Sequence, residues 1–274
     1  MLTVRRALGR TVKIAAASID RVRAPAPGVV VQLYHRVGGR SSLEVDLERE
    51  IFDEQMAFLA ASTDVMRLED ALQLLANPLP APRAPAVAVT FDDGTDDFVE
   101  VAMPILSHHR IPVTMYVATS FVEDAIAFPG GGRPASWSGL ADACSTGLVD
   151  IGSHTHRHLL LDRLAPAALA DELDRSVGLI GERLGRAAAD FAYPKAVAGS
   201  PDADRAVRSR FRSAALAGTR ANPYGRTDLF RLARSPIQRS DGMGYFCRKV
   251  AGGMAFEDTL RRAANRIRYA GMRS

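Results

Sequence analysis

The chain has 274 residues, 47% of them hydrophobic, which is enough for one large α/β domain with an ample core. It contains no low-complexity block, no internal repeat and no apolar run near the roughly 18 residues that span a bilayer. With only two cysteines, Cys144 and Cys247, the chain has no disulfide framework, and its net charge is +4.

That net charge comes from the two ends of the chain. Residues 1–23 contain six basic residues and one acid, and residues 235–274 contain eight and three, so each end carries +5 and the body between them carries −6. An acidic body repels phosphate, and the basic ends lack interleaved aromatic residues. We therefore expect no binding to nucleic acid.

Both ends have apolar residues at helical spacing, which predicts an amphipathic helix at each end. Arginines without a long apolar stretch or a cleavage site indicate no signal peptide, so a cytoplasmic location is expected. Two interpretations stay open: the helices pack on the domain with their arginines in water, or they lie peripherally on the inner face of an anionic membrane. The apolar positions are Leu8, Val12, Ala15, Ile19 and Val22, with Lys13 off the stripe, and Phe256, Leu260, Ala263, Ile267 and Ala270.

Between the ends, predicted strands alternate with predicted helices, the pattern of a parallel α/β fold. The proline-rich stretch 77–85 is short and leads directly into a strand, so we interpret it as a stiff surface loop and not as a domain boundary. The stretch 121–137 contains three consecutive glycines and is predicted to be a loop. Strands are expected at 29–34, 87–91, 113–117, 149–153, 190–193, 213–217 and 232–235, and helices at 47–61, 68–76, 99–109 and 166–184.

Two adjacent carboxylates follow the apolar strand 87–91. A buried parallel strand delivers its last residues to the C-terminal rim of a sheet or barrel, where α/β folds keep their sites. Neighbouring side chains of a regular strand point to opposite faces. Asp92 and Asp93 can therefore share a site only if the backbone turns there, and Gly94 allows that turn. The alternative is an ordinary Asp-Gly turn.

A second polar cluster follows the strand 149–153 and contains three of the six histidines. His154 and His158 are four residues apart, so on a helical turn their rings would stand on one face, within reach of one cation. His156 would point elsewhere, to the surface or to a place behind the ligands. Two imidazoles and one carboxylate hold a divalent metal and leave positions open for water and substrate, which is typical of a catalytic site.

These motifs resemble those of a known family. Thr90-Phe91-Asp92-Asp93-Gly94 together with His154-Thr155-x-x-His158 is similar to the first two motifs of the polysaccharide deacetylases, the NodB-homology proteins of carbohydrate esterase family 4. The resemblance implies a single-domain, distorted (β/α) barrel over residues 28–237, flanked by the basic segments 1–27 and 238–274. Further matches are Tyr34-His35-Arg36-Val37, Phe191-Ala192-Tyr193-Pro194 and Arg231-Leu232.

The resemblance also implies roles for individual residues. Asp93, His154 and His158 would bind the metal, and Asp92 would be the general base. The metal would be zinc, with cobalt, nickel or manganese as alternatives. For the only tryptophan a core position is the first expectation and stacking on a sugar the second. The candidate substrate contacts are Arg36, Tyr193, Pro194 and Trp137.

The chain departs from the family in the part of the site that handles protons. At the position of Ala192, many members carry an arginine that orients the base. Many members also have a histidine late in the chain that is the general acid, whereas this chain has no histidine after His158. His35 ends a predicted strand at the same rim and is the natural substitute for that acid, with Arg36 as a neighbouring cation. The alternative is that His35 only forms a hydrogen bond in the barrel mouth.

The sequence therefore predicts a metal-dependent hydrolase that removes N-acetyl groups from a sugar in a polysaccharide, an oligosaccharide or a lipid-linked glycan. Two alternatives stay open: a deformylase or another hydrolase of non-peptide carbon–nitrogen bonds in a small molecule, and a catalytically inactive, glycan-binding relative. The expected partner is the N-acetylated glycan. The identity of the sugar and the oligomeric state are left open.

Overall fold

In the described part of the chain, seven parallel strands close into a barrel. The computed structural model describes residues 13–18, 20, 25–77 and 84–260. The strands pair all the way round, because the last of the series also pairs with the first. In order around the barrel they are β1 (Gly28–Tyr34), β5 (Ala86–Phe91), β6 (Val113–Val117), β7 (Val149–Ser153), β8 (Asp190–Ala192), β9 (Ser213–Ala217) and β11 (Leu232–Pro236). The predicted single-domain, distorted (β/α) barrel is confirmed.

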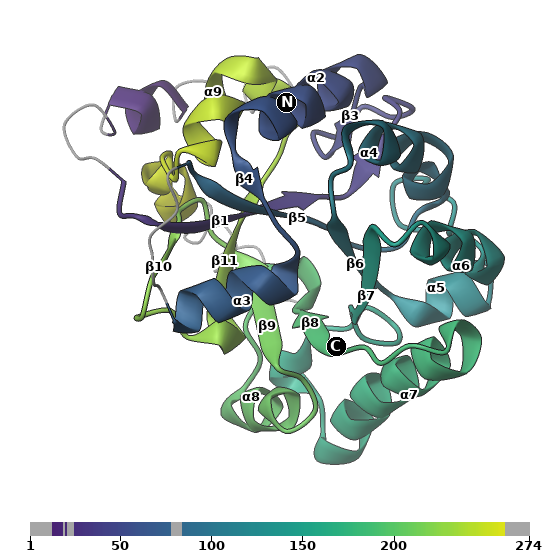
Figure 1. Ribbon diagram of the computed structural model, residues 1–274. Coiled ribbons are helices and arrows are strands. Elements are labelled where there is room, and N and C mark those ends of the chain that lie inside the picture. Colours follow the sequence, from purple (N-terminus) through teal and green to yellow (C-terminus); the bar gives the residue numbers. More distant parts are fainter. Residues whose placement is uncertain (1–12, 19, 21–24, 78–83, 261–274) are drawn as a thin grey trace.

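Helices surround this barrel (Figure 1). They are α2 (Arg49–Ser62), α3 (Leu68–Ala76), α4 (Met103–His109), α5 (Thr119–Glu123), α6 (Trp137–Ser145), α7 (Pro166–Leu184), α8 (Pro201–Arg208) and α9 (Gly242–Val250). A π-helix, η1 (Phe98–Ala102), runs directly into α4, and the 3-10 turns are η2 (Leu161–Arg163), η3 (Pro194–Ala196), η4 (Leu229–Arg231) and η5 (Arg239–Asp241). The short strands β2 (Arg36–Val37) and β3 (Asp46–Leu47) pair with each other, whereas β4 (Asp64–Val65) pairs with β5 and β10 (Asn222–Pro223) with β1.

Most of the predicted elements are present, several with the expected ends. The bounds of α3, β6, α7 and β9 agree with the prediction, whereas α8 and α9 were not predicted. The stretch predicted as a loop, 121–137, is largely irregular, and α6 starts at its last residue. Of the two terminal helices, residues 13–18 and 255–260 are helical, and the remainder of each predicted stripe lies outside the described residues, as do residues 78–83 of the proline-rich loop.

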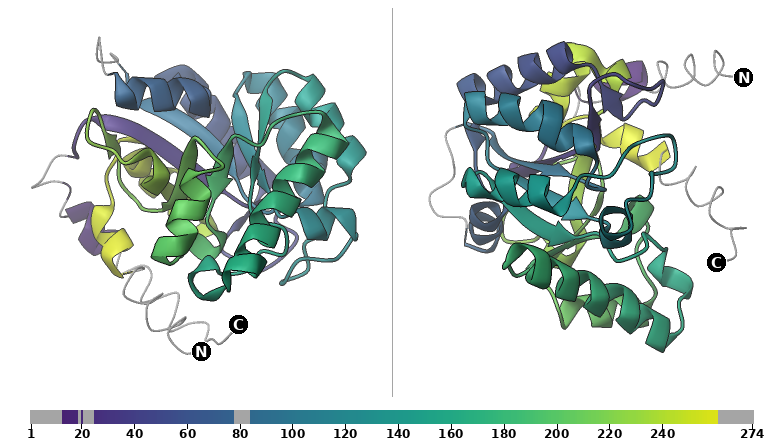
Figure 2. Two further views of the ribbon diagram at one scale, coloured as in Figure 1. Left: turned by 90° about the horizontal axis from the view of Figure 1, so that it is seen from below. Right: turned by 90° about the vertical axis from the view of Figure 1, so that its right-hand side faces the viewer.

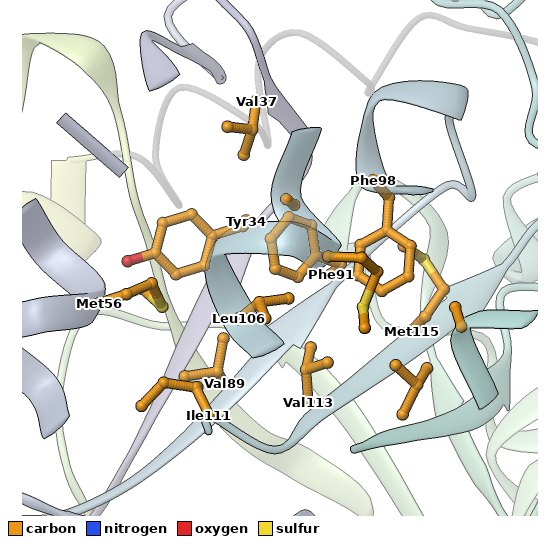
Figure 3. Close-up of a cluster of buried hydrophobic side chains, with 14 of the residues drawn as sticks. Tyr34, Val37, Met56, Val89, Phe91, Phe98, Leu106, Ile111, Val113 and Met115 are labelled. Carbon is orange, nitrogen blue, oxygen red and sulfur yellow. The ribbon is translucent and has the colours of Figure 1, made fainter. Parts of the chain in front are cut away.

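The larger apolar core lies between the outer face of the barrel and its helices (Figure 3). The ring of Tyr34 stacks on that of Phe91 with centroids 5.3 Å apart, and Phe91 meets Phe98 of η1 at 5.1 Å. Val89 and Val113 continue this layer on β5 and β6. Dense packing of this kind holds β5 rigid, and β5 is the strand whose end carries the two aspartates.

A second apolar cluster fills the inside of the barrel, and α3 closes one end of it. Leu72 and Leu75 of α3 pack with Val29 of β1 in this cluster, and Figure 1 shows α3 lying across the near end of the barrel. Inside, Gly152 makes room for the ring of Tyr116, since a Cβ at that glycine would lie 2.5 Å from a ring carbon. The opposite end, where the strands terminate, is the barrel mouth. None of the described helices is both long and apolar enough to cross a membrane.

Candidate active site

Three potential metal ligands meet at the mouth, where β5 and β7 end. One ligand atom from each of Asp93, His154 and His158 lies within 4.8 Å of the others. His154 Nε2 lies 3.8 Å from Asp93 Oδ1, and His158 Nε2 lies 3.7 Å from the same oxygen. The structure therefore brings together the three residues that were predicted as ligands.

Left-handed backbone conformations turn these side chains toward one another. Asp93 and Gly94 have φ angles of 77° and 93°, so the chain turns after β5 as expected. The helical turn expected for the histidines is wrong, because the segment that carries them is an irregular loop. Thr155 and His158 have φ angles of 66° and 58° in it, and these two bends fold the loop back so that the rings of His154 and His158 stand 4.7 Å apart.

The protonation and the spacing of the donor atoms suit a divalent cation. His154 Nδ1 donates a hydrogen bond to the carbonyl oxygen of Ala192 at 2.8 Å, so in the neutral ring Nε2 is unprotonated and lies on the side of Asp93. Burial lowers the pKa of His154 and of His158 to about 4, so both rings are neutral near pH 7, as ligands must be. Ligand atoms around a tetrahedral zinc ion stand about 3.4 Å apart, close to the separations in this cluster. These residues fit a divalent cation.

A buried arginine holds Asp92 beside this cluster. Asp92 Oδ2 lies 3.7 Å from His154 Nε2. Arg234 of β11 donates from Nη1 to Asp92 Oδ1 at 2.6 Å and from Nη2 to Oδ2 at 2.8 Å, and both side chains are buried. The guanidinium also lies over the ring of Tyr116, 5.1 Å from its centroid. A bidentate pair of this kind fixes the carboxylate in orientation as well as in charge.

Arg234 therefore occupies the orienting role that the sequence left vacant at Ala192. Ala192 is on β8, and its carbonyl instead positions His154. The sequence-based prediction missed Arg234, although one signal was present: an arginine in the middle of a barrel strand needs a buried acid as partner. Which acid it meets could not be read from the sequence, because the partner lies 142 residues away.

Replacing Arg234 with methionine is expected to remove most of the activity while divalent metal stays bound. Methionine leaves the buried Asp92 without its partner, so the pKa of that carboxyl rises and its orientation is lost. We expect kcat/KM to fall about 10²-fold or more, and its acid limb to move to higher pH. The measurement is kcat/KM against pH, together with metal content.

Arg212 offers a matched control for that variant. It forms a similar bidentate pair with Asp190, at 3.1 and 3.0 Å, but at the other end of β8. Arg212→Met is expected to retain the wild-type pH profile. An Arg234→Met variant with an unchanged acid limb would contradict the orienting role.

Neighbouring helices hold the histidine loop in place. Glu172 of α7 is fully buried and accepts hydrogen bonds from the backbone nitrogen of Arg157 at 2.8 Å and from its Nε at 2.5 Å. His156 is buried too, and its Nδ1 lies 3.0 Å from the hydroxyl of Thr119 on α5. Of the two places expected for His156, the surface is therefore wrong, and the residue lies behind the ligands, where it anchors the loop.

Two further basic side chains, His35 and Lys195, lie near the cluster. The backbone nitrogen of Asp92 donates to the carbonyl of Tyr34 at 3.0 Å, so His35 follows directly beside Asp92. Its Nδ1 is buried and has no hydrogen-bond partner among the described residues. Lys195, which was not predicted, follows β8 with a φ of 54°. Burial mainly lowers the pKa of His158, and the charges of Lys195 and His35 lower it further.

Arg36 and Trp137, predicted as substrate contacts, are held by other residues. Arg36 donates from Nε to Asp97 Oδ2 at 3.2 Å and from Nη1 to the carbonyl of Gly130 at 3.4 Å. The indole nitrogen of Trp137 donates to Glu123 Oε2 at 2.7 Å, and the ring packs against the larger core. These contacts tie the loop between α5 and α6 to the barrel. Contact of either side chain with a sugar stays a prediction.

Tyr193 and Pro194, the other two predicted substrate contacts, directly follow β8 and are both buried. The hydroxyl of Tyr193 lies 3.4 Å from Asp204 Oδ1, and its ring packs edge-on against Phe191 at 5.1 Å. They support the turn that carries Lys195, and their contact with substrate also stays a prediction.

Several known proteins are similar to this chain. The polysaccharide deacetylase family model matches residues 80–212. IcaB from Ammonifex degensii is 25% identical over 82% of this chain and 98% of its own, with a TM-score of 0.71. The Streptococcus pyogenes deacetylase PplD, in complex with acetate, is 20% identical over 83% and 99%, also with a TM-score of 0.71. A de-N-acetylase from Aggregatibacter actinomycetemcomitans is 17% identical over 81% and 99%, with a TM-score of 0.64.

No curated protein matches the chain. The segment matched by the family model, residues 80–212, contains Asp92 and the three potential ligands. It contains neither His35, which directly follows β1, nor Arg234 of β11.

Proposed function

We propose that this protein is a metal-dependent hydrolase that removes N-acetyl groups from a sugar in a polysaccharide, an oligosaccharide or a lipid-linked glycan, because residues 80–212 match the polysaccharide deacetylase family model. The observation that carries the proposal is the cluster of Asp93, His154 and His158 beside an Asp92 that Arg234 holds in place. A ligand set and a separate, oriented carboxylate are together what hydrolysis of an amide requires.

Asp93, His154 and His158 would hold the cation, with zinc as the first candidate and cobalt, nickel or manganese as alternatives. When bound, a divalent cation polarises the acetyl carbonyl and lowers the pKa of a bound water from about 15.7 toward 7. Three protein ligands leave the remaining coordination positions to water and substrate.

Asp92 would be the general base. Burial by itself raises its pKa, but the charge of Arg234, followed by that of His154, outweighs burial and lowers the pKa to about 2. The carboxylate is therefore ionised at any working pH, but it is a weak base. It would accept the proton while the water attacks the carbonyl, since the water becomes more acidic as the new bond forms. Arg234 would keep the carboxylate in place during that transfer.

The leaving amine needs a proton, and His35 would donate it. Histidine is the most frequent general acid, and this one lies beside Asp92 with a buried ring nitrogen that has no partner among the described residues. Lys195, whose charge contributes to the lowered pKa of His158, would add positive charge where the carbonyl oxygen becomes negative.

Replacing His35 with glutamine is expected to slow turnover about 10²-fold or more, because the amine then leaves without its proton donor. Metal content is expected to stay at the wild-type level, since His35 is not a ligand. His108→Gln is the matched control, because His108 is an exposed histidine on α4. Near wild-type turnover of His35→Gln across the pH range would exclude His35 as the acid and leave Lys195 as the candidate.

Two other functions were left open by the sequence: hydrolysis of another carbon–nitrogen bond in a small molecule, and glycan binding without catalysis. The pair of Arg234 and Asp92 speaks against the inactive alternative, because it supplies the orienting arginine whose absence raised it. A panel of N-acetylated glycans, N-formylated sugars and small amides distinguishes the three. We expect acetate from the glycans, whereas formate from the sugars or no product from any compound would overturn the proposal.

A further inference from the structure

Large apolar side chains are exposed at the barrel mouth. In the part of the chain that the structure describes, the exposed large hydrophobic residues are Ile14, Leu43, Ile126, Leu159 and Leu260. Leu43, Ile126 and Leu159 lie in segments that follow the C-terminal ends of β1, β6 and β7. Because those strand ends form the mouth, these three side chains are on the side of the molecule where the candidate site opens.

Both described ends of the chain lie on the same side. Lys13 binds Asp241 Oδ1 at 2.7 Å, and Asp241 comes shortly after the end of β11. Asp258 binds Arg220 at 3.1 Å, and Arg220 comes shortly after the end of β9. Both views of Figure 2 show the purple N-terminal and yellow C-terminal segments on the side of the barrel away from α3.

In each of these two segments a buried charged side chain lies close in sequence to an exposed large apolar one. Lys13 is 3% exposed, whereas its neighbour Ile14 is 52% exposed. Asp258 is 1% exposed, whereas Leu260 is 39% exposed. A helix that only packs on a domain shows the reverse pattern. The exposed side chains of Ile14 and Leu260 therefore indicate a surface that they contact.

The loop between α5 and α6 adds an apolar segment to the mouth. Residues 125–132 carry no polar or charged side chain, and Ile126 in this segment is 50% exposed. The side chain of Leu43 lies close to Gly130 of this segment, since a Cβ on that glycine would come within 2.9 Å of it. The loop returns beside the candidate site, because the backbone nitrogen of Ala135 donates to the carbonyl of Gly94 at 2.9 Å. Its apolar residues therefore lie close to the place where substrate enters.

The chain continues from the mouth into strongly basic sequence at both ends. Residues 1–12 contain three arginines and residues 261–274 contain five, and neither stretch contains an acid. They are joined to Lys13 and Leu260, which lie at the mouth, whereas the body of the chain carries −6. Positive charge is thus attached on the apolar side of the molecule, a combination that complements an anionic lipid surface.

We propose that the mouth side docks on an anionic phospholipid bilayer. Ile14, Leu43, Ile126, Leu159 and Leu260 enter the interface, and the positive charge of the sequence at both ends of the chain favours an anionic surface. The candidate site then opens toward the bilayer, so the enzyme meets a glycan that is attached to lipid or lies along the membrane. This docking does not depend on which acyl group is removed.

Cosedimentation of the full chain with vesicles tests this proposal. The wild-type protein is expected to pellet with vesicles of phosphatidylglycerol and phosphatidylcholine but not with phosphatidylcholine alone, and binding should decrease with added salt. Ile14→Glu and Ile126→Glu are each expected to weaken the apparent affinity about fivefold or more, because each loses an inserted apolar side chain and adds a repelled charge. Gln73→Glu adds the same charge on an exposed position of α3, at the closed end, and should bind as the wild type does.

Absence of binding to the anionic vesicles would overturn the proposal, as would wild-type binding by both isoleucine variants or equal weakening by Gln73→Glu. The competing occupant of this surface is a second copy of the chain, and sedimentation equilibrium tests for it. If the protein does not bind vesicles but forms a dimer that Ile126→Glu dissociates, the surface is a dimer interface. Circular dichroism of each variant shows whether it folds. Hydrolysis of a soluble substrate should be unchanged in Ile14→Glu, whose position lies outside the loop between α5 and α6, so failure of the docking proposal can be told from failure of the proposed function.

Discussion

Replacing His154 with alanine is expected to abolish tight binding of one divalent ion and, with it, hydrolysis. The ring is almost fully buried, its Nδ1 is held by the carbonyl of Ala192, and its Nε2 faces both Asp92 and Asp93. Loss of one of three ligands should weaken metal binding about 10²-fold or more. The measurement is metal content after dialysis against a competing chelator, combined with the rate of acetate release.

His156→Ala is the matched control for that variant. His156 is a buried histidine of the same loop, but it faces Thr119 and not the cluster. We expect this variant to keep its metal through the same dialysis, with an affinity loss of at most about 10-fold because the loop loses only an anchor. If His154→Ala still binds metal stoichiometrically, the ligand assignment is wrong.

Changing Asp92 to asparagine is expected to leave the metal bound and to reduce turnover about 10²–10⁴-fold, the usual cost of a lost general base. Asparagine keeps the shape of the side chain but cannot accept the proton. It also leaves Arg234 buried opposite a neutral group, so thermal unfolding must be measured to show that the variant folds. The comparison is kcat at saturating metal.

Asp93→Asn separates the two carboxylates. Asp93 Oδ1 lies within 3.8 Å of both ligand histidines, so this variant is expected to lose metal affinity first and to regain part of its activity in excess metal. Asp92→Asn should gain nothing from excess metal. Identical metal titrations of the two variants would contradict the division of roles between base and ligand.

The barrel and the ligand set could be predicted from the sequence because both depend on local signals. Alternating strands and helices specify a parallel α/β fold, and the ends of its strands meet at one rim. That rule alone brings Asp93 and the loop of His154 together, even though the helical turn expected for the histidines is wrong. The left-handed conformations of Thr155 and His158 align the two rings. Such conformations are uncommon for residues other than glycine, and the spacing of the histidines does not predict them.

The sequence could not predict which residues pair with the buried charged side chains, because closure of the barrel determines which strands lie next to one another. Arg234 reaches Asp92 because β1 pairs with β11 on one side and with β5 on the other, which brings the two residues together. Arg36 was predicted as a substrate contact, and its partners in the structure, Asp97 and a carbonyl of the α5–α6 loop, could not be predicted. An arginine at a strand end has several acids within reach, and the sequence does not rank them.

The terminal segments show a different limit. Their periodicity predicted an amphipathic helix with Lys13 off the apolar stripe, and it gave no sign that Lys13 lies in a buried cluster with Asp241, which Lys249 also contacts at 2.9 Å. A buried ion pair can decide which side of a helix faces the protein, because leaving Asp241 unpaired would cost more free energy than exposing one isoleucine. The predicted cytoplasmic location is not tested by this arrangement and stays a prediction.

The central claim is that the ligand cluster and Asp92 together hydrolyse an N-acetyl group with the help of a divalent metal. The most direct measurement is acetate and free amine released from an N-acetylated oligosaccharide by metal-stripped protein as zinc is added back. We predict no release from the stripped protein, equal amounts of acetate and amine after addition, and a rate that rises until one zinc ion is bound per chain. Release at the full rate by metal-free protein, or no release from any N-acetylated glycan at full zinc occupancy, would contradict the account.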